Sequence, residues 1–129
     1  KIKIQGDRVP DVADSFEKLK NKYSLSEKFM KSIKRAGYVR PSPVQMQGIP
    51  ILFEKRDCIM LAETGSGKSL AFIAPLIHMH KKGDGLKAII VAPTRELAIQ
   101  LYKEFLMFKS DTGARVKFLR KALTPKDDV

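Results

Sequence analysis

The sequence lacks the features of a secreted or membrane protein. Its 129 residues include one cysteine, Cys58, so an internal disulfide bond is impossible. No apolar run approaches the roughly 18 residues that a membrane-spanning helix needs. We find neither a signal peptide nor a low-complexity tract. We therefore expect an intracellular protein in a reducing compartment, with Cys58 as a small buried hydrophobic residue.

The length allows one domain at most, with a single hydrophobic core. The chain begins with Lys1 rather than methionine, so we expect a piece of a longer protein. Residues 1–15 show no periodicity and are expected to be extended. We assign residues 1–23 to an N-terminal extension and residues 24–129 to the domain.

Acidic residues are scarce relative to basic ones. The chain holds 25 lysines and arginines against 14 acidic residues, for a net charge of +11. The excess lies in residues 1–40 and 76–129, whereas residues 41–75 are balanced. Such an excess fits a polyanionic partner, because neutralising phosphates releases counterions. A well-solvated lysine surface explains it equally well, so charge alone does not decide between the two.

The most informative segment is a glycine-bearing turn with the sequence AETGSGKS at residues 62–69. An apolar run precedes it and a helical pattern follows, which is the context of a phosphate-binding P-loop. Glycines let the backbone turn N–H groups inward, the helix N-terminus adds partial positive charge, and Lys68 adds a full charge. Ser69 is placed to offer its hydroxyl to magnesium. A turn that merely precedes a helix is the alternative, but the register of Lys68 and Ser69 favours a nucleoside triphosphate site.

Alternating apolar patterns predict an α/β fold with a parallel sheet. Buried strands are expected at residues 59–62, 88–92 and 116–119. We expect helices at four places: from a capping box at Ser24–Glu27 to Gly37, from Pro43 towards Phe53, from the P-loop to about Lys81, and from Thr94 to Phe108.

Two residues upstream of the P-loop are candidates for adenine recognition. A glutamine amide such as Gln45 has both a donor and an acceptor, which match the adenine amino group and N7. Tyr38 can supply a flat surface for stacking. The alternative reading is a polar surface glutamine and a core tyrosine.

A second candidate site follows the expected strand at residues 88–92. Thr94 can cap the next helix, and Arg95 beside the free N–H groups can form a phosphate clamp. This site would share the sheet edge of the P-loop, where ligands of open α/β sheets bind. A capped helix with one exposed arginine is the alternative.

Together these segments resemble the DEAD-box RNA helicases. Residues 37–45 (GYVRPSPVQ) match the Q motif of that family, residues 62–69 match motif I, and residues 93–100 (PTRELAIQ) match motif Ia, in the family's order and spacing. Phe16 is the candidate for the family's isolated upstream aromatic residue. The resemblance implies a partial RecA-like P-loop NTPase domain that stops before the Walker B strand.

The resemblance also implies ATP and Mg²⁺ as ligands. Tyr38 would stack on adenine, Gln45 would read its edge, and the Arg40 carbonyl would add a contact. Lys68 would contact the β and γ phosphates, and Ser69 would contact the magnesium ion. Other phosphate contacts would come from Thr64, Gly65, Ser66 and Gly67.

For RNA, the resemblance implies that Thr94 and Arg95 touch the sugar–phosphate backbone without sequence readout. The parent protein would be an ATP-dependent RNA helicase. The Asp-Glu-Ala-Asp box, the Ser-Ala-Thr motif and the second RecA-like domain of the family are absent from this chain. Phosphoryl transfer needs such carboxylates and arginines. We therefore expect this chain to bind nucleotide weakly and not to hydrolyse it or unwind RNA.

The comparison with the family has two further implications. Strands that would lie between those of the P-loop and motif Ia are missing. Unpaired edges should therefore make the chain self-associate or leave it partly disordered, unless the rest of its domain is supplied in trans. Residues 119–122 (LRKA) replace a usual Gly-Gly pair, and residues 16–24 contain an insertion. Some ribosome-assembly members share both features, which points to ribosome biogenesis and to the nucleus or nucleolus, with the cytoplasm as the alternative.

Two other functions fit parts of the sequence. One is a different P-loop enzyme, such as a nucleotide kinase or GTPase, against which the adenine-type residues argue. The other is a non-catalytic nucleic-acid-binding module whose P-loop only stabilises the fold. His78 and His80 match no family role and are expected at the surface.

Overall fold

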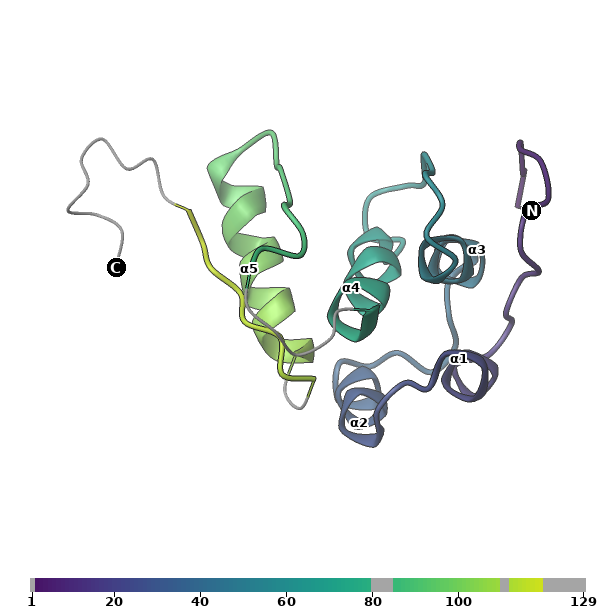
Figure 1. Cartoon of the computed structure of the whole chain (residues 1–129), viewed down its shortest axis with the longest axis horizontal. Coiled ribbons are helices and arrows are strands. Elements are labelled where there is room, and N and C mark those ends of the chain that lie inside the picture. The colour runs from purple at the N-terminus through teal and green to yellow at the C-terminus, as the bar shows by residue number, and fades with distance from the viewer. Residues whose placement is uncertain (1, 80–84, 110–111, 120–129) are drawn as a thin grey trace.

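The computed structural model describes residues 2–79, 85–109 and 112–119, and the regular secondary structure in them is helical. Figure 1 shows three longer helices in a row, with α4 between α5 and α3, and two short helices beneath them. Their bounds are α1 (Phe16–Tyr23), α2 (Glu27–Arg35), α3 (Pro43–Phe53), α4 (Lys68–Met79) and α5 (Arg95–Phe108).

The first two helices differ from the prediction. Helix α1 was not predicted, and the capping box expected at Ser24–Glu27 is wrong. Ser24 ends α1 in the left-handed conformation, with φ of 56° and its N–H donating to the Lys20 carbonyl. The N-cap of α2 is Ser26, whose Oγ accepts from the Phe29 N–H at 3.1 Å. A residue that terminates one helix in this conformation cannot also supply the extended N-cap of the next.

The N-terminal segment is hydrogen-bonded to α3 at a backbone carbonyl that has no partner within the helix. Pro50 lies inside α3 and has no N–H to donate to the carbonyl four residues earlier, that of Met46. The Ala13 N–H donates to this carbonyl instead, at 3.1 Å. The next residue of α3, Gln47, donates from Nε2 to the Pro10 carbonyl at 3.1 Å. Residues 2–14 have no regular structure, as expected, but they are attached along one side of α3.

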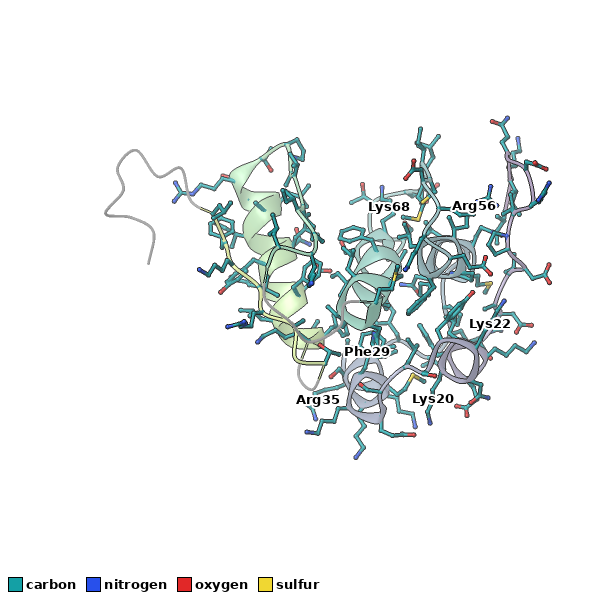
Figure 2. All side chains as sticks on the ribbon, viewed as in Figure 1. Lys20, Lys22, Phe29, Arg35, Arg56 and Lys68 are labelled. Carbon is teal, nitrogen blue, oxygen red and sulfur yellow. The ribbon has the colours of Figure 1, made fainter. Side chains whose placement is uncertain are left out.

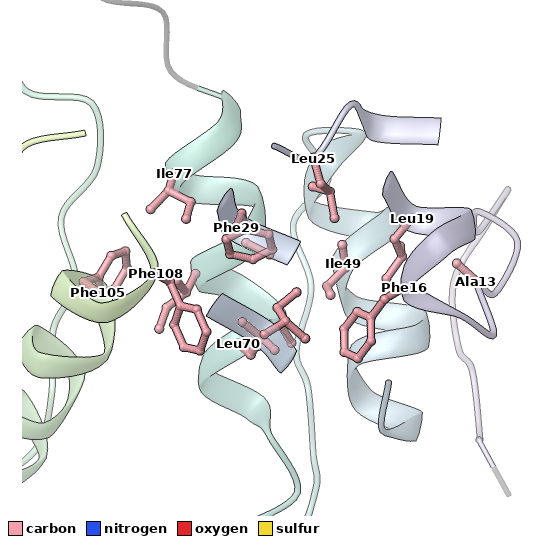
Figure 3. Close-up of a cluster of buried hydrophobic side chains, with 14 residues drawn as sticks. Ala13, Phe16, Leu19, Leu25, Phe29, Ile49, Leu70, Ile77, Phe105 and Phe108 are labelled. Carbon is pink, nitrogen blue, oxygen red and sulfur yellow. The ribbon is translucent and has the colours of Figure 1, made fainter. Parts of the chain in front are cut away.

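One hydrophobic core joins the helices. Figure 3 shows side chains from α1, α3, α4 and α5 meeting around Phe29 of α2, which has no exposed surface. Phe29 packs its ring 5.8 Å from that of Phe108. A side chain at Gly48 of α3 would overlap the Met60 sulfur and lie 3.4 Å from the Ala71 Cβ, so glycine lets α3 approach α4 closely. In the part of the chain that is described, no helix is long and apolar enough to cross a membrane.

The three segments predicted as strands do not form a sheet among the described residues. Residues 59–62, 88–92 and 116–119 have no regular secondary structure, and no backbone hydrogen bond joins the first to the second. Residues 59–62 still alternate as a strand does. Ile59 is 90% exposed and Leu61 is 91% exposed, whereas Met60 packs against the core. The outer face of residues 59–62 therefore leaves two large apolar side chains, Ile59 and Leu61, exposed to solvent.

His78 is not the surface residue that was predicted. It is half-buried in the last turn of α4, with its ring edge-on to Phe29 at 4.7 Å. Its Nε2 accepts from the Ser26 N–H at 3.3 Å, which leaves the proton on Nδ1, 2.8 Å from the Ala74 carbonyl that accepts it. The ring thus connects the N-cap of α2 to α4. His80 lies outside the described residues.

Cys58 packs beside the loop as a neutral thiol. It is half-buried rather than fully buried, before the P-loop. Burial raises the pKa of the thiol, and the neighbouring Asp57 carboxylate raises this pKa further. Both effects disfavour the thiolate, so the residue serves packing rather than nucleophilic chemistry.

Replacing Phe29 with alanine should be among the most destabilising single changes in this core. We expect Phe29→Ala to lower the free energy of unfolding by about 3–5 kcal/mol, because a fully buried ring is lost and a cavity is left. The matched control is Leu106→Ala on α5, where the leucine is 40% exposed. This variant should change the free energy of unfolding by less than about 0.5 kcal/mol. Urea unfolding followed by circular dichroism measures both. Equal losses would contradict the central position of Phe29.

Candidate nucleotide-binding site

The turn at residues 62–69 has the backbone of an anion-binding loop. Gly65 and Gly67 have φ values of 81° and 85°, which side chains rarely adopt. Between them the Ser66 N–H donates to the Glu63 carbonyl at 3.1 Å. Helix α4 begins directly at Lys68. The N–H groups of its first turn have no carbonyl within the helix and face the end at which the loop lies.

Lys68 closes this loop in the structure. Its ammonium donates to the Ala62 carbonyl at 2.5 Å, so the side chain bridges the start and end of the turn. An ammonium has three donors, and two of these remain for an anion that lies over the loop. Ser69, next along the helix, is half-buried.

One buried hydroxyl group in the loop lacks a partner. The Oγ atom of Ser66 is buried and has no hydrogen-bond partner among the described residues. A buried unpaired hydroxyl is unfavourable unless a ligand or water satisfies it. Together with Lys68 and the free N–H groups, Ser66 supplies donors of the kind that phosphate oxygens accept. The loop therefore fits a phosphate-bearing ligand.

Gln45 connects α3 to this loop. Its side chain has no exposed surface. The Oε1 atom accepts from the Ser42 N–H at 2.9 Å, and the Nε2 atom donates to the Gly67 carbonyl at 3.2 Å. A side chain on Gly67 would overlap this amide, so glycine is required there for contact as well as for conformation. Both polar atoms of Gln45 are thus bonded to backbone, and reading an adenine edge requires exchanging these partners.

Sequence reasoning proposed Gln45 as an adenine reader and did not foresee its contact with Gly67. Half of this arrangement had a sequence signal. Ser42 and Gln45 are spaced as Ser-x-x-Gln, the pattern in which the later side chain bonds the N-cap N–H. The structure shows that bond. The contact with Gly67 spans 22 positions and has no local signal.

Tyr38 and Arg40 lie in the connection between α2 and α3. Tyr38 is half-buried against the core, and its N–H donates to the Ile33 carbonyl at 3.1 Å. Arg40 is exposed. Both precede the helix that carries Gln45, so the backbone brings them to the same end of α3.

Thr94 caps α5 as predicted. Its Oγ1 accepts from the Leu97 N–H at 3.2 Å, and its backbone is extended, with φ of −131°. Arg95 is the first residue of the helix and is exposed. In Figure 1, α5 and α4 both begin at the upper end of the view, so Arg95 and the P-loop are at the same end of the molecule.

A hollow of about 500 Å³ lies between these two helices and the segment that precedes α5. Lys68 and Ser69 are at its polar end. The rest of its lining is apolar: Phe72, Leu76, Ile89, Ile90, Val91, Leu97 and Leu101. A nucleotide needs the polar end only, and the apolar part suits packed side chains. Among the described residues there is no group of three or more histidine, cysteine or acidic side chains that could hold a metal ion.

Several known proteins are similar to this chain. "Probable ATP-dependent RNA helicase DDX52" of Bos taurus is 39% identical over 125 residues, which cover 95% of this chain and 21% of that protein. "ATP-dependent RNA helicase ROK1" of Lodderomyces elongisporus is 33% identical over an alignment 131 residues long, which covers 98% of this chain and 24% of that protein. The chain thus spans between a fifth and a quarter of the length of these relatives.

Solved structures agree with the sequence relatives. The RNA helicase Prp28 from Chaetomium thermophilum bound to ADP matches with a TM-score of 0.73 and 36% identity, over 87% of this chain and 28% of that one. A DEAD box protein from Methanococcus jannaschii matches with a TM-score of 0.65 and 36% identity, over 76% of this chain and 26% of that one. A model of the DEAD/DEAH box helicase family matches residues 42–128, more than half of the chain. The chain therefore belongs to the DEAD/DEAH box helicase family.

Proposed function

We propose that this chain binds ATP with Mg²⁺ at residues 62–69 and forms part of an ATP-dependent RNA helicase. The observation that carries the proposal is the loop itself. Two glycines with positive φ place Lys68 and an unpaired Ser66 hydroxyl at the start of α4. A related structure, that of Prp28, holds ADP. ATP supplies the energy for remodelling, and the magnesium ion neutralises its phosphates.

The proposed roles follow the order of the loop. Lys68 contacts the β and γ phosphates after releasing the Ala62 carbonyl, and Ser69 offers its hydroxyl to the magnesium ion. The backbone N–H groups of Thr64, Gly65 and Gly67 and the Ser66 hydroxyl hold the remaining phosphate oxygens. Tyr38 stacks on the adenine, and the Arg40 carbonyl adds a contact to its edge. Gln45 holds the loop through the Gly67 carbonyl and exchanges its backbone partners for the adenine edge when ATP binds.

RNA is proposed to bind at the start of α5, at the same end of the molecule. The free N–H groups of the first turn and the exposed Arg95 suit a phosphate group, and Thr94 keeps that turn formed. Neither residue is placed to read bases, so binding should be independent of RNA sequence. The same end of the molecule would then hold both ligands.

Hydrolysis and RNA unwinding are proposed for the parent protein and not for this chain alone. The loop residues suit phosphate binding, whereas phosphoryl transfer also needs carboxylates and arginines of the kind that the family's Asp-Glu-Ala-Asp box and second domain supply. We also propose a role in ribosome biogenesis, with a nuclear or nucleolar location. The replacement of Gly-Gly at residues 119–122 supports it. We further propose that the parent protein has a full RecA-like fold with a parallel sheet.

The phosphate site is tested with Lys68→Ala. We expect this variant to lose at least tenfold in ATP affinity, because charge-assisted bonds are worth about 1.5–3 kcal/mol each. Lys55→Ala removes an equal charge from an exposed position and should bind ATP like the unchanged chain. Fluorescence anisotropy with a labelled ATP analogue measures both, with GTP as a competitor. Unchanged affinity in Lys68→Ala would refute the site, and equal competition by GTP would favour another P-loop enzyme.

Gln45 is tested by its contribution to stability without ligand. Gln45→Ala removes two buried hydrogen bonds and leaves the Ser42 N–H and the Gly67 carbonyl without their partner, so it should destabilise the chain by about 2–4 kcal/mol. Gln100→Ala on the exposed side of α5 should have an effect below about 0.5 kcal/mol. Thermal unfolding without nucleotide compares them. A neutral Gln45→Ala would show that the contact with the loop is incidental.

Self-association is proposed through the uncovered segments 59–62 and 88–92. Leu61 is 91% exposed and Val91 is 87% exposed, and apolar surface of this kind promotes pairing between copies. The double variant Leu61→Lys, Val91→Lys should therefore be more monomeric. Val39→Lys, at an 88% exposed position outside these segments, is the control. Light scattering after gel filtration reports the mass, and a monomeric unchanged chain would contradict the proposal.

A further inference from the structure

The outward face of α2 carries a row of exposed positive charge that forms no ion pairs with the described residues. Lys28, Lys31 and Arg35 are exposed and follow at steps of three and four residues, which places them along one side of the helix. Lys34 lies beside them and is also exposed. None of the four forms an ion pair with the described residues. The row faces away from the core side of α2, which is formed by residues such as Phe29.

The acidic side chain nearest to this row is already used. Glu27 forms an ion pair with Lys20 of α1, and this hydrogen-bonded contact lowers the pKa of the Glu27 carboxyl. Helix stability explains only part of the row. Lys34 and Arg35 lie in the last turn, where cations are favourable, and Lys31 lies four residues after Glu27. Lys28 is in the first turn, where a cation is unfavourable, and the like charges at these spacings repel one another. A binding role accounts for gathering all four exposed cations on one side of the helix.

The composition of the face indicates what it can bind. No large hydrophobic side chain between residues 13 and 38 is exposed. Protein interfaces are centred on aromatic and apolar residues and are poor in lysine, which argues against an acidic protein. Single-stranded nucleic acid is held by exposed aromatic rings. The nearby Tyr23 is unsuited to that, because it stacks on Phe53 at 4.3 Å. Of the polyanions compared, the regular phosphate backbone of a nucleic-acid duplex therefore suits this face best.

Figure 2 shows that this face is far from the nucleotide loop. Arg35 lies at the lower end of the molecule with Lys20 and Lys22, and Lys68 lies at the upper end. The start of α5, proposed above to contact RNA, is also at the upper end. The α2 face is therefore a separate surface and not an extension of that site.

We propose that the Lys28–Lys31–Arg35 face of α2 is a second RNA-binding surface, which takes the phosphate backbone of duplex RNA. The identity of the polyanion rests on the proposed RNA-helicase function. Successive cations lie about 4.5–6 Å apart along the helix axis. At this spacing they contact neighbouring phosphates without reading bases. An RNA molecule could then be held at one end of the chain by α2 while another segment contacts Arg95.

The test compares two triple variants that lose the same charge. The first is Lys28→Gln, Lys31→Gln, Arg35→Gln, and the control is Lys3→Gln, Lys55→Gln, Lys117→Gln, at exposed positions elsewhere. Anisotropy with a labelled RNA duplex of about 16 base pairs is measured over a range of salt concentrations. The first variant should reduce the steepness of the slope of log affinity against log salt concentration by about 2–3, since each phosphate contact contributes about 0.9 to this slope. The control should change the slope by less than about 1.

Each remaining outcome is decisive. If the two variants lose equally, or if polyglutamate competes as well as the duplex, α2 is not an RNA surface. If Arg95→Ala weakens binding and the α2 variant does not, the proposal for α2 fails while the RNA contact at α5 stands. If the unchanged chain does not bind duplex RNA, the proposal also fails, and ATP binding separately tests the nucleotide site. Retained ATP affinity in the α2 variant shows that it is folded.

Discussion

The amide of Gln45 holds the glycine-rich loop against α3, and the geometry of the nucleotide site depends on it. A loop with two glycines in positive-φ conformations is costly to order, because glycine loses the most conformational freedom on folding. The bond from Gln45 to the Gly67 carbonyl fixes the loop at the residue before α4 begins. The bond from Ser42 to the same amide fixes the start of α3. One buried side chain therefore sets the distance between two helix N-termini.

This contact requires α3 to lie close to α4, and two unusual residues of α3 allow it. Gly48 leaves room for the Met60 side chain, which a Cβ would overlap, in the space between α3 and Ala71 of α4. Pro50 interrupts the hydrogen bonds of α3, and Ala13 repairs the break by donating to the Met46 carbonyl. The N-terminal segment is thus part of the structure that positions the loop. Substitutions in the N-terminal segment can therefore alter the position of the loop through α3.

Features that depend on neighbours in the sequence were predictable. The start of α3 at Pro43, the cap at Thr94 and the glycine turn before Lys68 follow from local backbone chemistry, and the structure has all three. The failures involve contacts across the chain or competition between neighbouring signals. His78 was expected at the surface, because nothing local shows that it meets Phe29 and Ser26. Helix α1 was missed because its apolar positions are few and stand among charged residues.

The strands show the same limit. Alternating exposure at residues 59–62 has the period of a strand, yet a ladder needs a partner with matching hydrogen bonds, and the described residues supply none. Pairing is a property of two segments and cannot be read from one. For the nucleotide site, the sequence named Gln45 and Lys68 as candidate site residues. It did not show that the side chains of both are bonded to backbone carbonyls, those of Gly67 and Ala62.

The distribution of charge separates the two kinds of binding. Residues 41–75, which contain the loop, carry no net charge, so the loop attracts phosphate with N–H groups, a helix N-terminus and the single ammonium of Lys68. These act at short range and are partly shielded from salt, because the side chain of Lys68 is half-buried. The excess charge of residues 1–40 includes the exposed face of α2, where salt screens strongly. Raising the salt concentration should therefore weaken RNA binding far more than ATP binding, since only the former depends on exposed charge.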